Sequence, residues 1–235
     1  MIQHVCLCEC GCQRPKNQDR AGGWTAGDCG LFFVADGIGG HYSGETASQA
    51  IADALAAWWD NGRYLFQTAV QQQLQLLIQD CHTQILQSTP AGQQCGSTLV
   101  LLWLNGGAYT LLWAGDSRCY RTRRQLFRGK TQQLTVDDVV PASAPFAADR
   151  GKLRQAVGVG NCLLSMRSGE LEKGSLFTLC SDGIYKYCPP SRLYRHLARA
   201  QHTALLQSSA RDIEREVLTR HAPDNYSLVM VRLVP

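Results

Sequence analysis

Some segments of this chain are short continuous apolar runs, as in buried strands, and others repeat apolar residues at helical spacing. The order of these segments predicts the order of strands and helices. A short apolar run at residues 30–35 has the length of a buried strand. Residues 45–59 and 65–87 instead repeat apolar side chains at every third or fourth position, as amphipathic helices do. The first part of the chain is therefore predicted to form a strand and then two helices.

The apolar runs that follow predict a hairpin. Residues 97–104 and 108–114 are both apolar and are separated by Asn-Gly-Gly at 105–107, which is one of the strongest short hairpin signals. A further strand is predicted to begin at Cys119. The middle of the chain is thus expected to be β structure.

The rest of the chain repeats this succession of strands and helices. Irregular residues at 134–160 predict a surface loop or flap. The elements predicted after it are strands at 163–171 and 175–179, helices at about 190–200 and 203–220, and a strand at 225–233. Because there is no internal repeat and no linker, one domain spanning residues 1–235 is expected.

Composition narrows the class of protein. The chain has 235 residues, of which 45% are hydrophobic and 18% are charged, which is enough for one sizeable core. The formal net charge is +4, and the densest basic segment lies at 118–130. Because this segment has no basic helix and no interleaved aromatic residues, a solvated hairpin face is favoured over a nucleic-acid surface. No nucleic-acid partner is expected.

The amino-terminal segment and the cysteines bear on location. Residues 1–11 contain neither the basic segment nor the apolar core of a signal peptide, and no apolar run reaches the roughly 18 residues that span a bilayer. The 11 cysteines are an odd number in a chain longer than a typical disulfide-stapled domain. A cytoplasmic protein with reduced thiols and no membrane contact is expected.

Four of these cysteines recur at every second position near the amino terminus: Cys6, Cys8, Cys10 and Cys12. In a strand they would share one face, which is expected to be buried or half-buried. A metal or redox site is the alternative, although zinc sites favour wider spacing between paired cysteines. Cys8 and Arg14 also have the spacing of cysteine-dependent phosphatases, so a thiol-based hydrolase is a further alternative.

Aspartate recurs where a predicted strand meets a turn: Asp36, Asp116, Asp182 and Asp224. These like charges could share one site only if cations neutralised them. Hard oxygen ligands without histidine or cysteine nearby favour magnesium or manganese over zinc or copper. Two such ions would activate a water for in-line displacement at phosphorus, so the pattern indicates phosphoester hydrolysis.

Two further segments fit such a site. Glycine and serine are frequent at 37–44, so the backbone there can turn tightly and approach a ligand before a helix opens at Glu45. Arg14 lies in a polar, turn-forming stretch. An arginine held beside a metal site offers a bidentate fork to phosphate oxygens, which lysine does not.

Six segments in this order carry a resemblance to a known family: RPKNQD, DGIGGHYSGETAS, GSTLVLL, GDSRCY, CSDGIY and DNYSLVMV. Together they resemble the metal-dependent serine/threonine protein phosphatases of the PPM family, often called 2C-like. The resemblance extends from Arg14 to Val231. It implies an α+β fold, a four-layer αββα sandwich of two antiparallel sheets flanked by helix pairs.

The resemblance also implies roles for individual residues. It implies two Mn²⁺ or Mg²⁺ ions, with Asp36 bridging both, the Gly37 carbonyl on one, and Asp182 and Asp224 completing the other. A third, weaker ion is implied at Asp116, and Asp19 is implied behind the water shell of the first ion. Arg14 matches the phosphate-binding arginine.

Three departures from the family pattern concern the same site. Gln18 stands where many members have glutamate, which removes one charged group that organises water. Ile38 stands where animal members carry a candidate general-acid histidine; His41 is the candidate here, with a structural role as its alternative. The flap at 134–155 is also shorter than in many bacterial relatives.

The bacterial style of the motifs is similar to the members of the family that oppose a threonine kinase in type VI secretion clusters. This narrower resemblance implies a phosphoprotein substrate, with a serine/threonine kinase or a forkhead-associated protein as partner, and a monomeric enzyme. The expected function is metal-dependent hydrolysis of phosphoserine and phosphothreonine in proteins. A weakly active or inactive module that binds a phosphoprotein or kinase is the alternative, motivated by Gln18 and Ile38.

Overall fold

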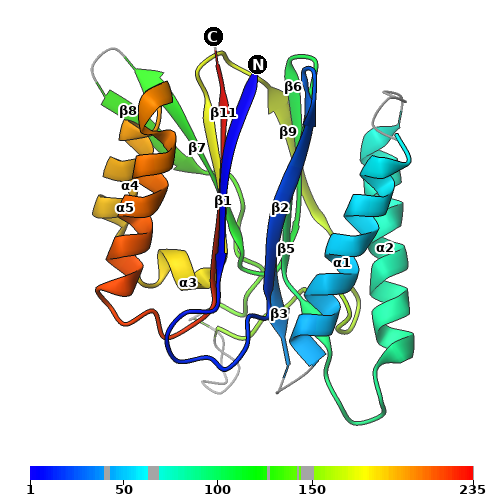
Figure 1. The fold of residues 1–235 in the computed structure, drawn as a ribbon. Coiled ribbons are helices and arrows are strands. Elements are labelled where there is room, and N and C mark those ends of the chain that lie inside the picture. Colours follow the sequence, from blue (N-terminus) through cyan, green and yellow to red (C-terminus); the bar gives the residue numbers. More distant parts are fainter. Residues whose placement is uncertain (40–42, 63–68, 126–127, 142, 144–150, 235) are drawn as a thin grey trace.

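Two antiparallel sheets lie face to face between two pairs of helices (Figure 1). The computed structural model describes residues 1–39, 43–62, 69–125, 128–141, 143 and 151–234. The α+β, four-layer αββα sandwich that the resemblance implies is therefore confirmed. One domain over residues 1–235 stays a prediction.

The elements of the described residues are as follows. One sheet contains β1 (Ile2–Glu9), β7 (Arg118–Gln125), β8 (Arg128–Gln133), β10 (Leu176–Cys180) and β11 (Tyr226–Leu233). The other contains β2 (Asp19–Ala26), β3 (Cys29–Ile38), β4 (Gly96–Ser97), β5 (Leu99–Asn105), β6 (Ala108–Ala114) and β9 (Ser165–Glu170). The helices are α1 (Ser43–Asp60), α2 (Val70–Ser88), α3 (Asp182–Tyr185), α4 (Pro190–Arg199), the 3-10 turn η3 (Thr203–Leu205) and α5 (Leu206–Leu218).

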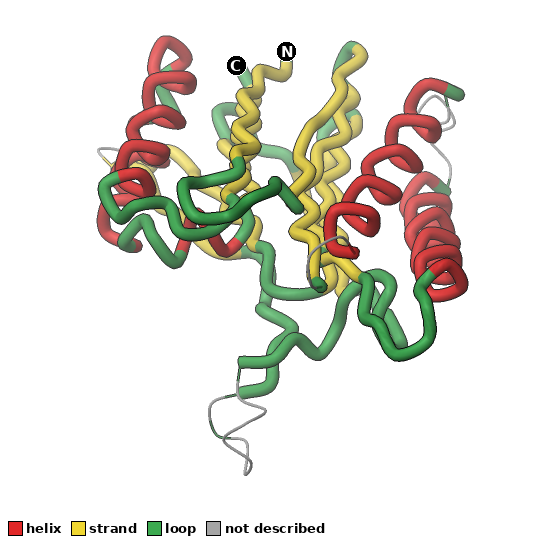
Figure 2. The backbone as a smooth tube through the Cα atoms, turned by 60° about the horizontal axis from the view of Figure 1, so that its bottom comes forward, coloured by secondary structure: helices red, strands yellow, loops and turns green. Residues whose placement is uncertain are grey.

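Sheet order brings the two ends of the chain together. The first sheet runs β1-β11-β10-β7-β8 and the second β2-β3-β5-β6-β9, with β4 paired to β3. β1 and β11 are antiparallel neighbours over their whole length, from Ile2 opposite Leu233 to Glu9 opposite Tyr226. Segments from both ends of the chain therefore meet at one edge of the sheets, between the helix pairs (Figure 2).

The apolar run of β3 is buried on both of its faces. Leu31, Phe33 and Ala35 pack with the helices α1 and α2, whereas Phe32 and Val34 face the opposite sheet. Successive side chains of a strand point to opposite faces, and both faces are buried here. The run predicted at 30–35 is thus confirmed and extends to Cys29–Ile38.

Most other predicted elements are present. The helix predicted at 45–59 spans Ser43–Asp60, and the hairpin turn falls at Gly106 and Gly107, which have φ of 53° and 108°. The helix predicted from residue 65 begins at Val70, after Ala69 at a φ of 67°. Among the described helices, none is long and apolar enough to cross a bilayer.

The sequence analysis does not predict β2, a strand that contains two glycines. Gly22 and Gly23 interrupt the side-chain pattern of this segment, yet both pair with β3. A Cβ on Gly23 would lie 2.2 Å from Cδ1 of Phe32. Glycine stands there because the aromatic ring of the neighbouring strand occupies the space of a side chain.

The prediction that the basic face of the hairpin at 118–130 is solvated is wrong for two of its arginines. Arg121 is 4% exposed, donates to the Glu170 carbonyl and lies 5.4 Å from the ring centroids of Tyr109 and Phe177. Arg118 donates to both oxygens of Asp137. Carbonyl, carboxylate and aromatic partners compensate these charges, which a sequence pattern does not reveal.

The structure also differs from the prediction at the cysteine face and at the flap. β1 ends at Glu9, and of its predicted cysteine face only Cys8 and Cys10 are half-buried, whereas Cys6 and Cys12 are exposed. In the predicted flap at 134–160, Val157 is fully buried because its backbone exchanges two hydrogen bonds with Ser97. The described end of the flap is therefore part of the body of the protein.

Candidate metal centre

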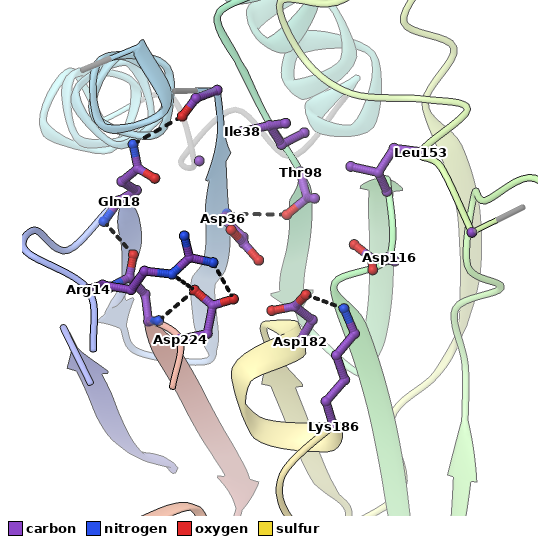
Figure 3. A pocket seen from close by; sticks show the side chains of 14 residues that line it. Arg14, Gln18, Asp36, Ile38, Thr98, Asp116, Leu153, Asp182, Lys186 and Asp224 are labelled. Carbon is purple, nitrogen blue, oxygen red and sulfur yellow. Dashed lines mark hydrogen bonds and ion pairs between the residues drawn. The ribbon is translucent and has the colours of Figure 1, made fainter. Parts of the chain in front are cut away.

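The aspartates predicted to share a site come together at the ends of strands from both sheets. Asp36 lies near the end of β3, Asp116 between β6 and β7, Asp182 at the start of α3, and Asp224 just before β11. All four line one pocket of about 320 Å³, and their carboxylates converge in Figure 3. Strands from both sheets thus deliver four carboxylates to one place.

The pocket also contains residues that the motifs predicted and residues that they did not. Arg14 and Gly37 line it, as the resemblance implies. The remaining described lining residues are Gln18, Ile38, Gly39, Thr98, Gly151, Leu153, Lys186 and Asn225. The pocket is therefore polar on most sides, with Ile38 and Leu153 as its apolar part.

The backbone of Asp36 is held by hydroxyl side chains from neighbouring strands. Its amide donates to Thr98 Oγ1 at 3.2 Å, and its carbonyl accepts from the Thr98 amide at 2.8 Å and from Ser97 Oγ at 3.0 Å. Thr98 Oγ1 is in turn 2.7 Å from Ser117 Oγ, beside Asp116. The GST and GDS segments therefore fix the positions of two of the aspartates.

The carboxyl group of Asp36 is buried among the negative charges of the other aspartates. Burial raises the pKa of its carboxyl well above the usual range, and the charges of Asp19, Asp182, Asp116 and Asp224 raise it further. Four other carboxylates thus act on one group. Such an arrangement is unfavourable unless protons or cations neutralise it.

Asp19 lies behind the pocket. It pairs with Asp36 across β2 and β3 and is 1% exposed. Its Oδ2 accepts from Ser181 Oγ at 2.8 Å, whereas its Oδ1 is buried with no hydrogen-bond partner among the described residues. Burial, opposed by this hydrogen bond, raises the pKa of Asp19 to about 6.

Cationic side chains already accompany two of the outer aspartates. Arg14 forms a bidentate pair with Asp224, with Nε 2.8 Å from Oδ1 and Nη2 donating to Oδ2 at 2.9 Å. Lys186 Nζ lies 2.6 Å from Asp182 Oδ2. The arginine predicted to bind phosphate therefore contacts a predicted metal ligand, and side chains of the protein supply part of the neutralising charge.

The donor set fits divalent cations. Within the described residues, no three histidine, cysteine, aspartate or glutamate side chains are gathered at coordination distance, and three of the pocket's aspartates have side-chain partners from the protein. Nevertheless, carboxylate oxygens dominate the pocket, and the unpartnered Oδ1 of Asp19 lies behind it. Hard oxygen donors with excess negative charge suit Mg²⁺ or Mn²⁺.

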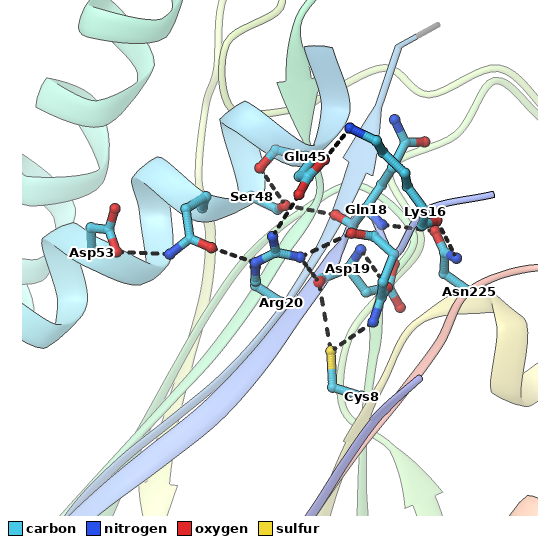
Figure 4. A network of polar contacts seen from close by, with 11 residues as sticks. Cys8, Lys16, Gln18, Asp19, Arg20, Glu45, Ser48, Asp53 and Asn225 are labelled. Carbon is cyan, nitrogen blue, oxygen red and sulfur yellow. Dashed lines mark hydrogen bonds and ion pairs between the residues drawn. The ribbon is translucent and has the colours of Figure 1, made fainter. Parts of the chain in front are cut away.

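Asn225 joins the loop of Arg14 to the strand of Asp224. Its Oδ1 accepts from the Gln18 amide at 2.9 Å, and its Nδ2 donates to the carbonyls of Cys10 at 2.7 Å and Lys16 at 2.9 Å. The side chain is 5% exposed. Figure 4 shows it against the end of this loop.

Replacing Asn225 by alanine is expected to destabilise the protein by about 1–3 kcal/mol, because it removes three hydrogen bonds to partly buried backbone groups. Urea unfolding measures this loss, and hydrogen exchange at the Gln18 amide is expected to accelerate. Asn61→Ala is the control, since that side chain is exposed and makes one bond, to the Ala57 carbonyl. Equal stability of the two variants would contradict this role.

The same loop is also tied to α1. Arg20 donates to the carbonyls of Asn17 and Asp19, and its Nη2 lies 3.2 Å from Glu45 Oε1 (Figure 4). Ser48 Oγ donates to the Gln18 carbonyl at 2.6 Å. The position of Arg14 therefore depends on contacts from β2, α1 and the start of β11.

The other predicted site residues are placed as follows. His41 lies outside the described residues, so its role as general acid stays a prediction. Ile38 lines the pocket, and Gln18 lines it with Nε2 3.4 Å from the Gly39 carbonyl. Gln18 thus connects the Arg14 loop to the glycine-rich segment without a charge.

The geometry does not favour the thiol-based alternative. Cys8 is absent from the described lining of the pocket, and its Sγ accepts from Asn17 Nδ2 and Ser227 Oγ. Burial raises the pKa of the Cys8 thiol. A thiol kept protonated in this way is a poor nucleophile.

Several positioning residues had no clear signal in the sequence. Ser181 and Asn225 adjoin predicted aspartates, but their partners lie far away in the chain. Tyr185 donates to Asp116 Oδ2 at 3.0 Å, and Cζ of Arg118 lies over its ring, 3.6 Å from the ring centroid. Lys186 follows Asp182 by four residues, a spacing that could have indicated the contact on a helix.

Fold and site together define a class of protein: an αββα sandwich with a carboxylate pocket suited to divalent cations at one sheet edge. The family model described as Protein phosphatase 2C matches residues 13–220. The chain therefore belongs to the protein phosphatase 2C family.

Individual relatives agree with this assignment. The chain is 26% identical to the serine/threonine protein phosphatase PstP of Mycobacterium tuberculosis, over 100% of its own length and 45% of that protein, so it spans about half of this relative. The catalytic domain of PstP in complex with two manganese ions has a TM-score of 0.79 at 24% identity, covering 100% of this chain and 99% of that one. PppA, described as a key regulatory component of T6SS in Pseudomonas aeruginosa, has a TM-score of 0.73 at 29% identity, covering 98% and 97%.

Proposed function

We propose that this chain is a metal-dependent phosphatase that hydrolyses phosphoserine and phosphothreonine in proteins. The observation that carries the proposal is the convergence of five aspartates, four of which raise the pKa of the fifth, Asp36. Membership of the protein phosphatase 2C family supports the reaction class.

Asp36, Asp182, Asp224 and the Gly37 carbonyl hold two divalent cations in this proposal, and Asp19 supports their water shell from behind. The manganese-bound relative supports Mn²⁺, and the same oxygen donors accept Mg²⁺. The ions, when bound, supply a water-derived nucleophile and charge neutralisation at phosphorus. The third ion that the resemblance implies at Asp116 is not part of the proposed centre.

Substrate binding is assigned to Arg14. Its side chain is 51% exposed and lines the pocket, where the guanidinium can turn from Asp224 to two phosphate oxygens. Where Asp224 would hold a cation, its carboxylate would be a weaker partner for Arg14, whose guanidinium would then be available to phosphate. His41 is the proposed proton donor to the leaving serine or threonine oxygen.

A bacterial serine/threonine kinase is the proposed opposing enzyme. The 29% identity to PppA supports a role in type VI secretion, with a kinase or forkhead-associated protein as the phosphorylated partner. A monomer in the cytoplasm completes the proposal.

The test is hydrolysis of a phosphothreonine peptide with manganese, with magnesium and with EDTA. We expect turnover with either cation, and a loss of at least about 100-fold on chelation, because the nucleophile and the charge neutralisation depend on the ions. Cys8→Ser is the control for the thiol-based alternative and is expected to leave activity unchanged. Activity that survives EDTA would contradict the proposal.

The same assay distinguishes the second function. A chain that hydrolyses neither the phosphothreonine peptide nor p-nitrophenyl phosphate with any divalent cation would be a phosphoprotein-binding module. Binding of the uncleaved phosphopeptide, measured by fluorescence anisotropy, would then replace turnover as the readout.

A further inference from the structure

Lys186 brings a positive charge into the carboxylate pocket. Its Nζ lies 2.6 Å from Asp182 Oδ2, and the residue lines the pocket opposite Arg14. Figure 3 shows the side chain of Lys186, the residue that follows α3, with its ammonium group at the Asp182 carboxylate. The mechanism proposed above gives this lysine no role.

The ammonium group acts on more than one aspartate. Although partial burial lowers it, the pKa of Lys186 is raised overall, because Asp182 accepts its hydrogen bond and Asp182, Asp116 and Asp36 attract its charge. In return, Lys186 lowers the pKa of Asp116, which burial raises. Figure 3 places the lysine on the side of the pocket that holds Asp116 and Asp182.

The backbone and neighbours of Lys186 hold it in this position. Its amide donates to the Asp182 carbonyl at 3.0 Å. The preceding residue, Tyr185, is fixed between Asp116 Oδ2 and the guanidinium of Arg118, which in turn donates to Asp137. The short segment that carries Lys186 is thus anchored at both of the aspartates that it faces.

We propose that the ammonium group of Lys186 permanently takes the place of a third divalent cation beside Asp116 and Asp182. The site would then hold two ions, and Lys186 would exclude a third by charge repulsion and by occupying Asp182 Oδ2. This inference rests on the proposed two-ion centre and corrects only the third ion that the resemblance implies at Asp116.

The test counts Mn²⁺ ions bound per chain by equilibrium dialysis, without any measurement of activity. Wild type is expected to saturate at two ions. Lys186→Asp is expected to bind a third, at least 10-fold more tightly than any further binding to wild type, and Lys186→Asp combined with Asp116→Asn is expected to lose it. Lys186→Met removes the charge but keeps the aliphatic stem, and is expected to bind a third ion more weakly than Lys186→Asp.

Lys173→Met is the matched control, because Lys173 is exposed in the turn between β9 and β10. Circular dichroism establishes that each variant is folded, and Lys186→Met serves if Lys186→Asp is not. Three ions in wild type, or two in both Lys186 variants, would overturn the inference while leaving the proposed function intact. Wild type that binds no ion would overturn both.

Discussion

Asp36→Asn is expected to lower kcat/KM for a phosphothreonine peptide by about 10³-fold, the loss typical of removing one preorganised electrostatic group from an active site. The substitution keeps the size and the backbone hydrogen bonds of Asp36 with Thr98 and removes one charge. Asp36 lies among four other aspartates that act on its carboxyl, and losing its charge is expected to weaken the proposed binding of both cations. Steady-state kinetics with saturating Mn²⁺ measures the loss.

The same variant is expected to be more stable than wild type without metal. Burial and like charges raise the pKa of Asp36, so its ionised form disfavours folding at neutral pH. A neutral asparagine removes this cost, and the metal-free melting temperature should rise. The increase in melting temperature on adding Mn²⁺ should shrink at the same time, because the variant lacks the carboxylate of Asp36, one of the proposed metal ligands.

Asp53→Asn is the matched control. Asp53 lies on α1, away from the pocket, and its Oδ1 accepts a hydrogen bond from Gln49. This variant should keep both the activity and the response to Mn²⁺. If Asp36→Asn retained a tenth of the wild-type kcat/KM, the bridging role assigned to Asp36 would be wrong.

Gly183→Ala is expected to destabilise the protein by about 1–3 kcal/mol and to reduce activity strongly. A Cβ at Gly183 would lie 2.0 Å from the Asn225 carbonyl oxygen and 3.0 Å from Tyr226 Cβ. Backbone atoms cannot rotate aside, so either α3 or the start of β11 must move. Asp182 and Asp224 adjoin these two residues, and the distance between these two proposed metal ligands is expected to change with them.

Thermal unfolding and Mn²⁺ affinity test this prediction together. A loss of 1–3 kcal/mol lowers the melting temperature of a chain of this length by roughly 2–12 °C. Gly22→Ala is the control, because its Cβ would lie 3.4 Å from Phe33 Cε1, an ordinary contact. A Gly183→Ala protein with unchanged stability and Mn²⁺ affinity would refute the close approach of the two segments.

The sequence predicted most of the fold because its strongest signals are local. Turn residues and apolar periods depend on neighbours within a few positions, so β3, α1 and the hairpin at Gly106 and Gly107 could be located. It failed at β2, where Gly23 leaves room for the Phe32 ring, and at Arg121, whose burial depends on Glu170 and two aromatic rings. These features depend on a neighbouring strand or on the opposite sheet.

The sequence by itself determined the membership of the site: Asp36, Asp116, Asp182 and Asp224 stand at strand ends, and the chemistry of four carboxylates calls for cations. Only the tertiary structure decided how these charges are held. Arg14 reaches Asp224 across 210 positions, Ser181 reaches Asp19 across 162, and Lys186 enters the pocket beside Asp116. The reason is physical: residue type and local spacing specify which chemistry a segment offers, whereas hydrogen-bond and ion-pair partners follow from the packing of strands that are distant in the chain.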